Sequence, residues 1–154
     1  MPALHFTTQI DGPSETIFAL IADITRYDRW LPRSSAFGAV IQVSHTPVGL
    51  STTYVDTGSS GAMHRSITDF QPLTRIAFQQ SMPIKQLLFT GTLELDIRYT
   101  LEAVGQKTRV NRDVGFHLSG VLKAAQPIVA ATIRKESQRI LLLKPYVETR
   151  PEDR

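Results

Sequence analysis

Three charged residues fall at positions where the surrounding sequence pattern calls for an apolar side chain. Arg112 lies in the apolar phase of the alternating stretch 109–118. Arg65 does the same in the stretch 62–70, and Glu136 interrupts an apolar helical stripe. Burying an unpaired charge costs several kcal/mol, so each of these groups should pair with another charge or meet a polar ligand or water.

Two interpretations of the two arginines follow from that cost. In the first, they pair inside the protein with Glu136 or with Asp69, which follows Arg65 on the same side of the chain, or they extend outward at a rim. In the second, one of them is the polar anchor of an otherwise apolar pocket, a common arrangement in binding sites. Tyr54 and Tyr99 would then offer hydroxyl groups to the ligand, or else bond to backbone and water.

Most familiar catalytic and cofactor signatures are missing from the sequence. There is no cysteine and the four histidines have no metal-ligand spacing, so neither thiolate chemistry nor a metal site is expected. The glycines in 58–61 belong to a hairpin turn, because the strand-to-helix context of a phosphate loop does not follow them. No G-x-S-x-G nucleophile motif occurs. The sequence therefore predicts no metal and no cofactor, and it assigns no catalytic residue.

The composition is that of one globular domain. The 154 residues are 42% hydrophobic and 20% charged, which excludes general disorder. The net charge of +3 comes from scattered lysines and arginines, so no nucleic-acid partner is expected. No apolar run approaches the roughly 18 residues of a membrane span, and the N-terminus lacks the pattern of a signal peptide. We expect a domain over 1–148, a polar tail over 149–154 and a cytoplasmic location, and a homodimer is left open.

The first part of the chain predicts one strand and two short helices. Alternation over 4–11 favours a strand, and Pro13 suits the start of the helix that follows. A second short helix is expected over 24–32, with Thr25 as its cap and Pro32 as its stop.

The rest of the chain predicts a sheet and a helix that cover each other. Over 36–118, six strands are separated by short turns containing Gly or Pro, which implies antiparallel neighbours. Odd positions of 87–101 are apolar and even positions are mostly polar, which is typical of a long strand with one dry face. An apolar stripe over 119–147 predicts a long helix. The fold class is therefore α+β, with seven antiparallel strands and the long helix on the dry face.

Four motifs occur in this order along the chain. They are "IDGPSETIFALIADITRYDRWLP" at 10–32, "TPVGLSTTY" at 46–54, "ITDFQPLTRIAF" at 67–78 and "RILLLKPYVE" at 139–148. Together they resemble the START-like, or SRPBCC, superfamily, and within it the polyketide cyclase/dehydrase-type group. The resemblance implies a helix-grip fold like that of Bet v 1: a curved seven-stranded sheet around the last helix, two short helices between strands 1 and 2, and a ligand cavity inside.

The resemblance also implies three classes of function. The leading one is binding or carriage of a hydrophobic small molecule, such as a lipid, a polyketide or an isoprenoid-like compound. The alternative is a polyketide aromatase/cyclase or dehydratase that acts in the same cavity. The third is an interaction module similar to the ribosome- or quinone-associated members, for which the mild positive charge is the only support.

The residues expected to line the cavity come from the second helix, the dry face of the sheet and the inner side of the last helix. They are Trp30, Tyr54, Arg65, Ile67, Phe78, Phe89, Leu93, Leu95, Tyr99, Arg112, Val114, Phe116, Val129, Ile133 and Glu136. For Trp30 and for the apolar members, packing in the core is the competing interpretation. Val129 is small and would leave room for a ligand.

Overall fold

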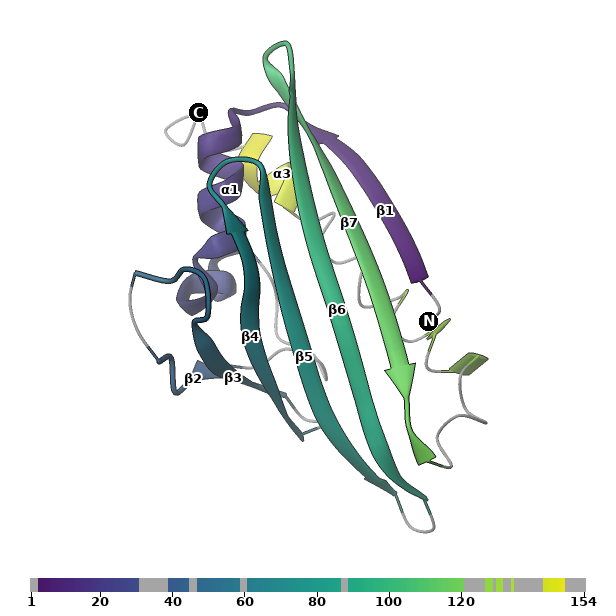
Figure 1. Ribbon diagram of the computed structural model, residues 1–154. Helices are drawn as coiled ribbons and strands as arrows, with labels where there is room; N and C mark the ends of the chain where they lie inside the picture. Colours follow the sequence, from purple (N-terminus) through teal and green to yellow (C-terminus); the bar gives the residue numbers. More distant parts are fainter. Residues whose placement is uncertain are drawn as a thin grey trace.

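The computed structural model describes residues 3–30, 39–44, 47–58, 61–86, 89–120, 127–128, 130–131, 134 and 143–148. Seven strands form one antiparallel sheet in the order β1-β7-β6-β5-β4-β3-β2 (Figure 1). The strands are β1 Ala3–Ile10, β2 Ala39–Ile41, β3 Thr53–Gly58, β4 Gly61–Gln71, β5 Arg75–Gln86, β6 Phe89–Val104 and β7 Lys107–Leu118. The predicted seven-stranded antiparallel sheet is confirmed.

The two short helices lie between β1 and β2, as expected. Helix α1 spans Ser14–Ala22 and follows Pro13, whose extended backbone makes it the N-cap. The second is a 3-10 helix, η1, over Ile24–Arg29. The prediction that Thr25 caps it is wrong, because the helix begins one residue earlier and Asp23 is its N-cap. The hydroxyl of Thr25 instead donates a hydrogen bond to the Asp23 carboxylate at 2.9 Å.

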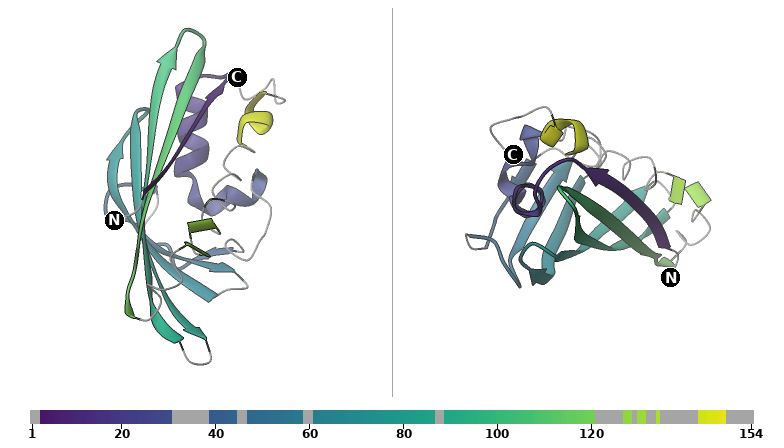
Figure 2. Two further views of the ribbon diagram at one scale, coloured as in Figure 1. Left: turned by 90° about the vertical axis from the view of Figure 1, so that its right-hand side faces the viewer. Right: turned by 90° about the horizontal axis from the view of Figure 1, so that it is seen from above.

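The long strand predicted from alternation is β6, which has sixteen residues. Its odd positions from Leu93 to Leu101 are buried, and its even positions Glu94, Asp96 and Arg98 are exposed. The sheet therefore has a buried inner face, on the side that carries α1 and α3, and an outer face (Figure 2). Burial of the inner face is the main apolar contribution to the stability of the sheet.

The long C-terminal helix predicted over 119–147 falls largely outside the described residues. Residues 127–128, 130–131 and 134 are helical, and helix α3 spans Leu143–Glu148. Leu143 and Val147 of α3 are fully buried. The described part of the C-terminal region is therefore an amphipathic helix end that packs near β1.

Polar contacts attach α3 to the end of β1. The Lys144 ammonium donates to the backbone carbonyl of Gln9 at 2.8 Å and to the Glu148 carboxylate at 2.7 Å. The backbone amide of Asp11 donates to the same carboxylate at 2.8 Å. These bonds, from Lys144 first and then from Asp11, lower the pKa of Glu148.

Gly12 is placed under α3 where no side chain fits. A Cβ atom built there would lie 2.7 Å from Cγ1 of the fully buried Val147. We expect Gly12→Ala to lower the free energy of unfolding by about 1–3 kcal/mol, the usual cost of overpacking. Urea unfolding would measure this, with Gly49→Ala as the control because nothing lies within 4 Å of a Cβ at that position. Equal stability of the two variants would contradict the close packing of α3.

Candidate functional site

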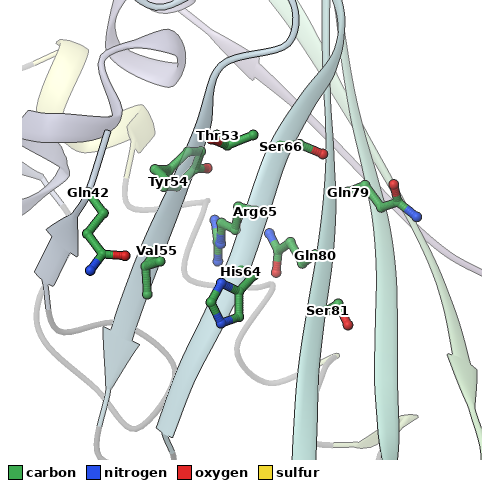
Figure 3. A pocket seen from close by; sticks show the side chains of 10 residues that line it. All are labelled: Gln42, Thr53, Tyr54, Val55, His64, Arg65, Ser66, Gln79, Gln80 and Ser81. Carbon is green, nitrogen blue, oxygen red and sulfur yellow. The ribbon is translucent and has the colours of Figure 1, made fainter. Parts of the chain in front are cut away.

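Strand alternation brings a row of polar side chains together on the inner face. Tyr54 of β3 faces Arg65 of β4, and Arg65 faces Gln80 of β5. Asp56 is two residues beyond Tyr54 and shares its face. Figure 3 shows Tyr54, Arg65 and Gln80 on three neighbouring strands, with Arg65 between the other two. We call these four residues the polar cluster.

Arg65 forms a buried ion pair within the polar cluster. Its Nη2 lies 2.9 Å from Oδ2 of Asp56, whose side chain is only 2% exposed. Its Cζ also stands 5.9 Å from the centroid of the Tyr54 ring, a cation–π distance. Arg65 is therefore paired inside the protein, but its partner is not the one that the sequence suggested.

The predicted pairing of Arg65 with Asp69 is wrong because the strand has a bulge. The β4–β5 register shifts between Ile67 and Asp69, so Asp69 lies opposite Ala77. A bulge reverses the alternation of the residues beyond it. Asp69 consequently points away from the polar cluster and pairs with Arg75 across the hairpin.

Each member of the polar cluster has a buried atom with no hydrogen-bond partner among the residues that the structure describes. These atoms are the Tyr54 hydroxyl, Asp56 Oδ1, Arg65 Nε and Gln80 Nε2. Tyr54, Asp56 and Gln80 are at most 3% exposed. A buried polar atom without a partner costs about 1–3 kcal/mol, so these four atoms call for a further partner, such as ordered water or a polar group of a ligand.

The environment sets the protonation of the polar cluster. Burial raises the pKa of Tyr54, although Arg65 opposes the effect, so the phenol is neutral at physiological pH. Burial also raises the pKa of Asp56, and the adjacent guanidinium again opposes it. For Arg65, burial alone would lower the pKa, but its interactions with Tyr54 and Asp56 together outweigh burial and raise the pKa. The cluster thus holds a neutral phenol and a compensated ion pair.

Arg112, the second arginine in an apolar phase, has different surroundings. Its Nε donates to the Tyr99 hydroxyl at 3.0 Å, and its Cζ lies 5.6 Å from the centroid of that ring. Its Nη1 is buried without a partner, and no carboxylate of the described residues forms an ion pair with it. Glu136, the predicted partner, lies outside the described residues. A small cavity of about 10 Å³ lies beside Arg112, Phe6 and Leu143.

Trp30 packs at the end of η1 and is 7% exposed. Its ring meets that of Tyr27 edge to face, with centroids 5.3 Å apart, and its Nε1 has no partner within the described ranges. The Tyr27 hydroxyl donates to the carbonyl of Ile21. Burial raises the pKa of Tyr27 well above its usual value, with contributions from Tyr54 and Tyr99.

The other predicted cavity residues with described side chains are buried on the inner face, at 1–8% exposure. They are Ile67, Phe78, Leu93, Leu95, Val114 and Phe116. Val129, Ile133 and the side chain of Phe89 lie outside the described parts. Sequence reasoning missed Asp56 and Gln80, although Asp56 has the phase of Tyr54 and Gln80 has the phase of Phe78.

A hollow of about 470 Å³ lies along β3, β4 and β5 (Figure 3). Its lining residues are Gln42, Thr53, Tyr54, Val55, His64, Arg65, Ser66, Gln79, Gln80 and Ser81. Alternation places most of these side chains on the outer face. Tyr54, Arg65 and Gln80 of the polar cluster also line the hollow, from three neighbouring strands.

Two features are absent from the described residues. In these ranges, no group of three or more His, Cys, Asp or Glu side chains could hold a metal ion. No helix within them has the length and apolar character needed to cross a membrane.

Comparisons with known proteins place the chain in a structural context. A family model described as "Polyketide cyclase / dehydrase and lipid transport" matches residues 1–143. Comparison with curated proteins gives no match. Among solved structures, Ara h 8.0201 has a TM-score of 0.72 at 15% identity, with 97% of this chain and 99% of that chain covered.

Two more solved structures have the same fold. The di-domain ARO/CYC BexL from the BE-7585A biosynthetic pathway has a TM-score of 0.75 at 16% identity. The match covers 99% of this chain and 48% of that chain. Aha1 from Colwellia psychrerythraea, solved as a dimer, has a TM-score of 0.65 at 17% identity. The match covers 96% of this chain and 97% of that chain. At such identities the likeness concerns the fold alone.

Proposed function

Since the chain belongs to the polyketide cyclase/dehydrase and lipid transport family, we propose that it binds a hydrophobic small molecule on the inner face of its sheet. In this proposal, the apolar body of the ligand contacts the inner-face side chains near Leu95 and Phe78. A polar group of the ligand meets the polar cluster. The site would then be mostly apolar with a few placed polar groups, as small-molecule sites usually are.

The observation that carries the proposal is the set of unpartnered buried atoms in the polar cluster. Buried polar groups in a stable core are normally bonded to protein or ordered water, so these four atoms leave bonds that a ligand or water can complete. Gln80 is 1% exposed and has apolar inner-face neighbours on its own strand, Phe78 and Met82. A ligand that supplies the missing hydrogen bonds accounts for keeping such a residue there.

An aromatase/cyclase or dehydratase activity in the same space is the second candidate. The neutral Tyr54 hydroxyl and the Arg65 guanidinium are on adjacent strands, and both can donate a hydrogen bond to a carbonyl oxygen. Donors fixed in a site without water stabilise the negative charge that develops on such an oxygen. Incubation with a poly-β-ketone chain and analysis of the products would separate catalysis from binding alone.

Gln80→Leu tests the binding proposal directly. Leucine fills similar volume and removes the unpartnered Nε2, so we expect the free energy of unfolding to stay within about 1 kcal/mol of wild type or to rise. The affinity for a polar-headed apolar probe should fall about three- to tenfold, the value of one neutral hydrogen bond. Displacement of an environment-sensitive dye by decanamide would measure the affinity, and urea unfolding the stability.

Gln79→Leu is the matched control, because Gln79 is the exposed neighbour on the outer face of the same strand. It should leave the affinity unchanged. The binding proposal fails if the wild type shows no saturable uptake of any member of a broad panel of dyes and lipids. It also fails if the two leucine variants lose affinity equally.

A further inference from the structure

We infer that the polar group received by the polar cluster is uncharged and both accepts and donates hydrogen bonds, as a carboxamide or a hydroxyketone does. This inference rests on the proposed function and concerns the chemistry of the ligand. It follows from two properties of the cluster: its net charge and its free hydrogen-bonding atoms.

The net charge of the cluster is zero. The positive charge of Arg65 is matched by Asp56, with 2.9 Å between Nη2 and Oδ2. Both members of the pair are largely removed from solvent, so water screens them little. A carboxylate or phosphate placed here would be attracted by Arg65 and repelled by Asp56 at similar distances. It would also lose its own hydration, so an anion gains little from this site.

The free atoms are three donors and one acceptor. Arg65 Nε and Gln80 Nε2 can only donate, and the Tyr54 hydroxyl donates when its partner is a carbonyl. Oδ1 of the Asp56 carboxylate can only accept. A ligand carbonyl would receive from the donors, while an O–H or N–H of the same ligand would donate to Asp56.

These atoms are close enough for one small group to reach them. Arg65 faces Tyr54 on one side and Gln80 on the other, so the row spans two strand spacings, or about 10 Å between the outer backbones. Asp56 is one alternation step along β3 from Tyr54. All four side chains extend from these positions on the inner face, and in the inference one small polar group meets them.

Three probes with one alkyl chain test the inference on the wild-type protein. Decanamide is neutral and both donates and accepts, decanoate is anionic and only accepts, and methyl decanoate is neutral and only accepts. We expect decanamide to bind at least about tenfold more tightly than decanoate at pH 7.5, the scale of a hydrogen bond to a charged group. Methyl decanoate should bind more weakly than decanamide by a similar factor, because the ester has no O–H or N–H to donate to the Asp56 carboxylate.

Asp56→Asn should remove the preference for the neutral probe. The substitution keeps the shape of the side chain but leaves Arg65 uncompensated, so the cluster becomes cationic. The preference for decanamide over decanoate should fall at least about tenfold relative to wild type, converted from the same hydrogen-bond scale. Asp69→Asn is the matched control: Asp69 also pairs with an arginine of this sheet, Arg75, but on the other side of the bulge. It should leave the preference unchanged.

The outcomes separate the inference from the proposed function. If none of the three probes binds and the dye is not taken up, the proposed function fails. If the probes bind and decanoate is as tight as decanamide or tighter, binding stands and the inference is overturned. The wild-type comparison gives this answer even if Asp56→Asn fails to fold, which its circular-dichroism spectrum would reveal.

Discussion

Replacing Arg65 with methionine should lower the free energy of unfolding by about 3–5 kcal/mol, because it leaves the Asp56 carboxylate buried and unpaired. The side chain of Asp56 is only 2% exposed, so water cannot replace the lost guanidinium. The double variant Arg65→Met, Asp56→Asn should recover much of the loss, since neither charge is then left alone. Urea unfolding of the four proteins in this cycle would measure the coupling. A double variant as unstable as Arg65→Met would show that the ion pair is not the cause.

The loss in Arg65→Met should also depend on pH. Burial raises the pKa of Asp56 in the folded protein, so the protonated carboxyl is favoured there and ionisation removes stability as the pH rises. Without Arg65, which opposes this effect, the pKa of Asp56 rises further. The deficit relative to wild type should therefore be small near pH 4 and grow toward pH 7, as the pH rises above the pKa of Asp56 in the folded wild type, which burial places above the ordinary value of about 3.9. A deficit that is constant with pH would contradict the proposed cause.

Phe116→Ala should cost about 3–5 kcal/mol of unfolding free energy, the usual loss for a large side chain in a packed core. Phe116 is 1% exposed and lies in the same cross-strand row as the polar cluster, opposite Leu95, which in turn faces Gln80. His117→Ala, its exposed neighbour on the outer face, should change stability by less than about 0.5 kcal/mol.

The same variant separates core residues from site residues within the row. Phe116 has no polar atom for a ligand, so Phe116→Ala should leave the preference for decanamide over decanoate unchanged. A change in that preference would place Phe116 in direct contact with the polar group of the probe. Dye displacement by decanamide and by decanoate, at a temperature where Phe116→Ala is folded, would measure this preference.

Alternation was enough to predict the sheet and the burial of its inner face. Over 93–101, the described part of the 87–101 pattern, the apolar phase correctly indicated the dry face, because burying that face is what fixes the register of a sheet. The order of the motifs along the chain, among them the helix that begins after Pro13, predicted the order of the strands and helices. The long C-terminal helix stays a prediction outside the described residues.

The pairing of the buried charges could not be predicted in the same way. Asp69 appeared to share a face with Arg65, but the bulge between Ile67 and Asp69 reversed the phase, and no turn residue or glycine in "SITDF" indicated it. The true partner, Asp56, is on a neighbouring strand, and its identity depends on strand register. A search for polar residues in the phase of buried neighbours on every strand would have found both Asp56 and Gln80.

The pairing of β1 with β7 has a consequence for how the chain is made. These strands join Ala3 to Gly115 and Ile10 to Thr108, so the first of the seven strands along the chain pairs with the seventh. At about 5–20 residues per second, a ribosome needs about 5–20 s to make the chain between them. During that time β1 and the apolar side of α1 have no β7 to cover them. Strands β3 to β7 pair as successive hairpins and can form as they emerge, whereas β1 must wait for β7, so we expect closure of the sheet by β1 to come late.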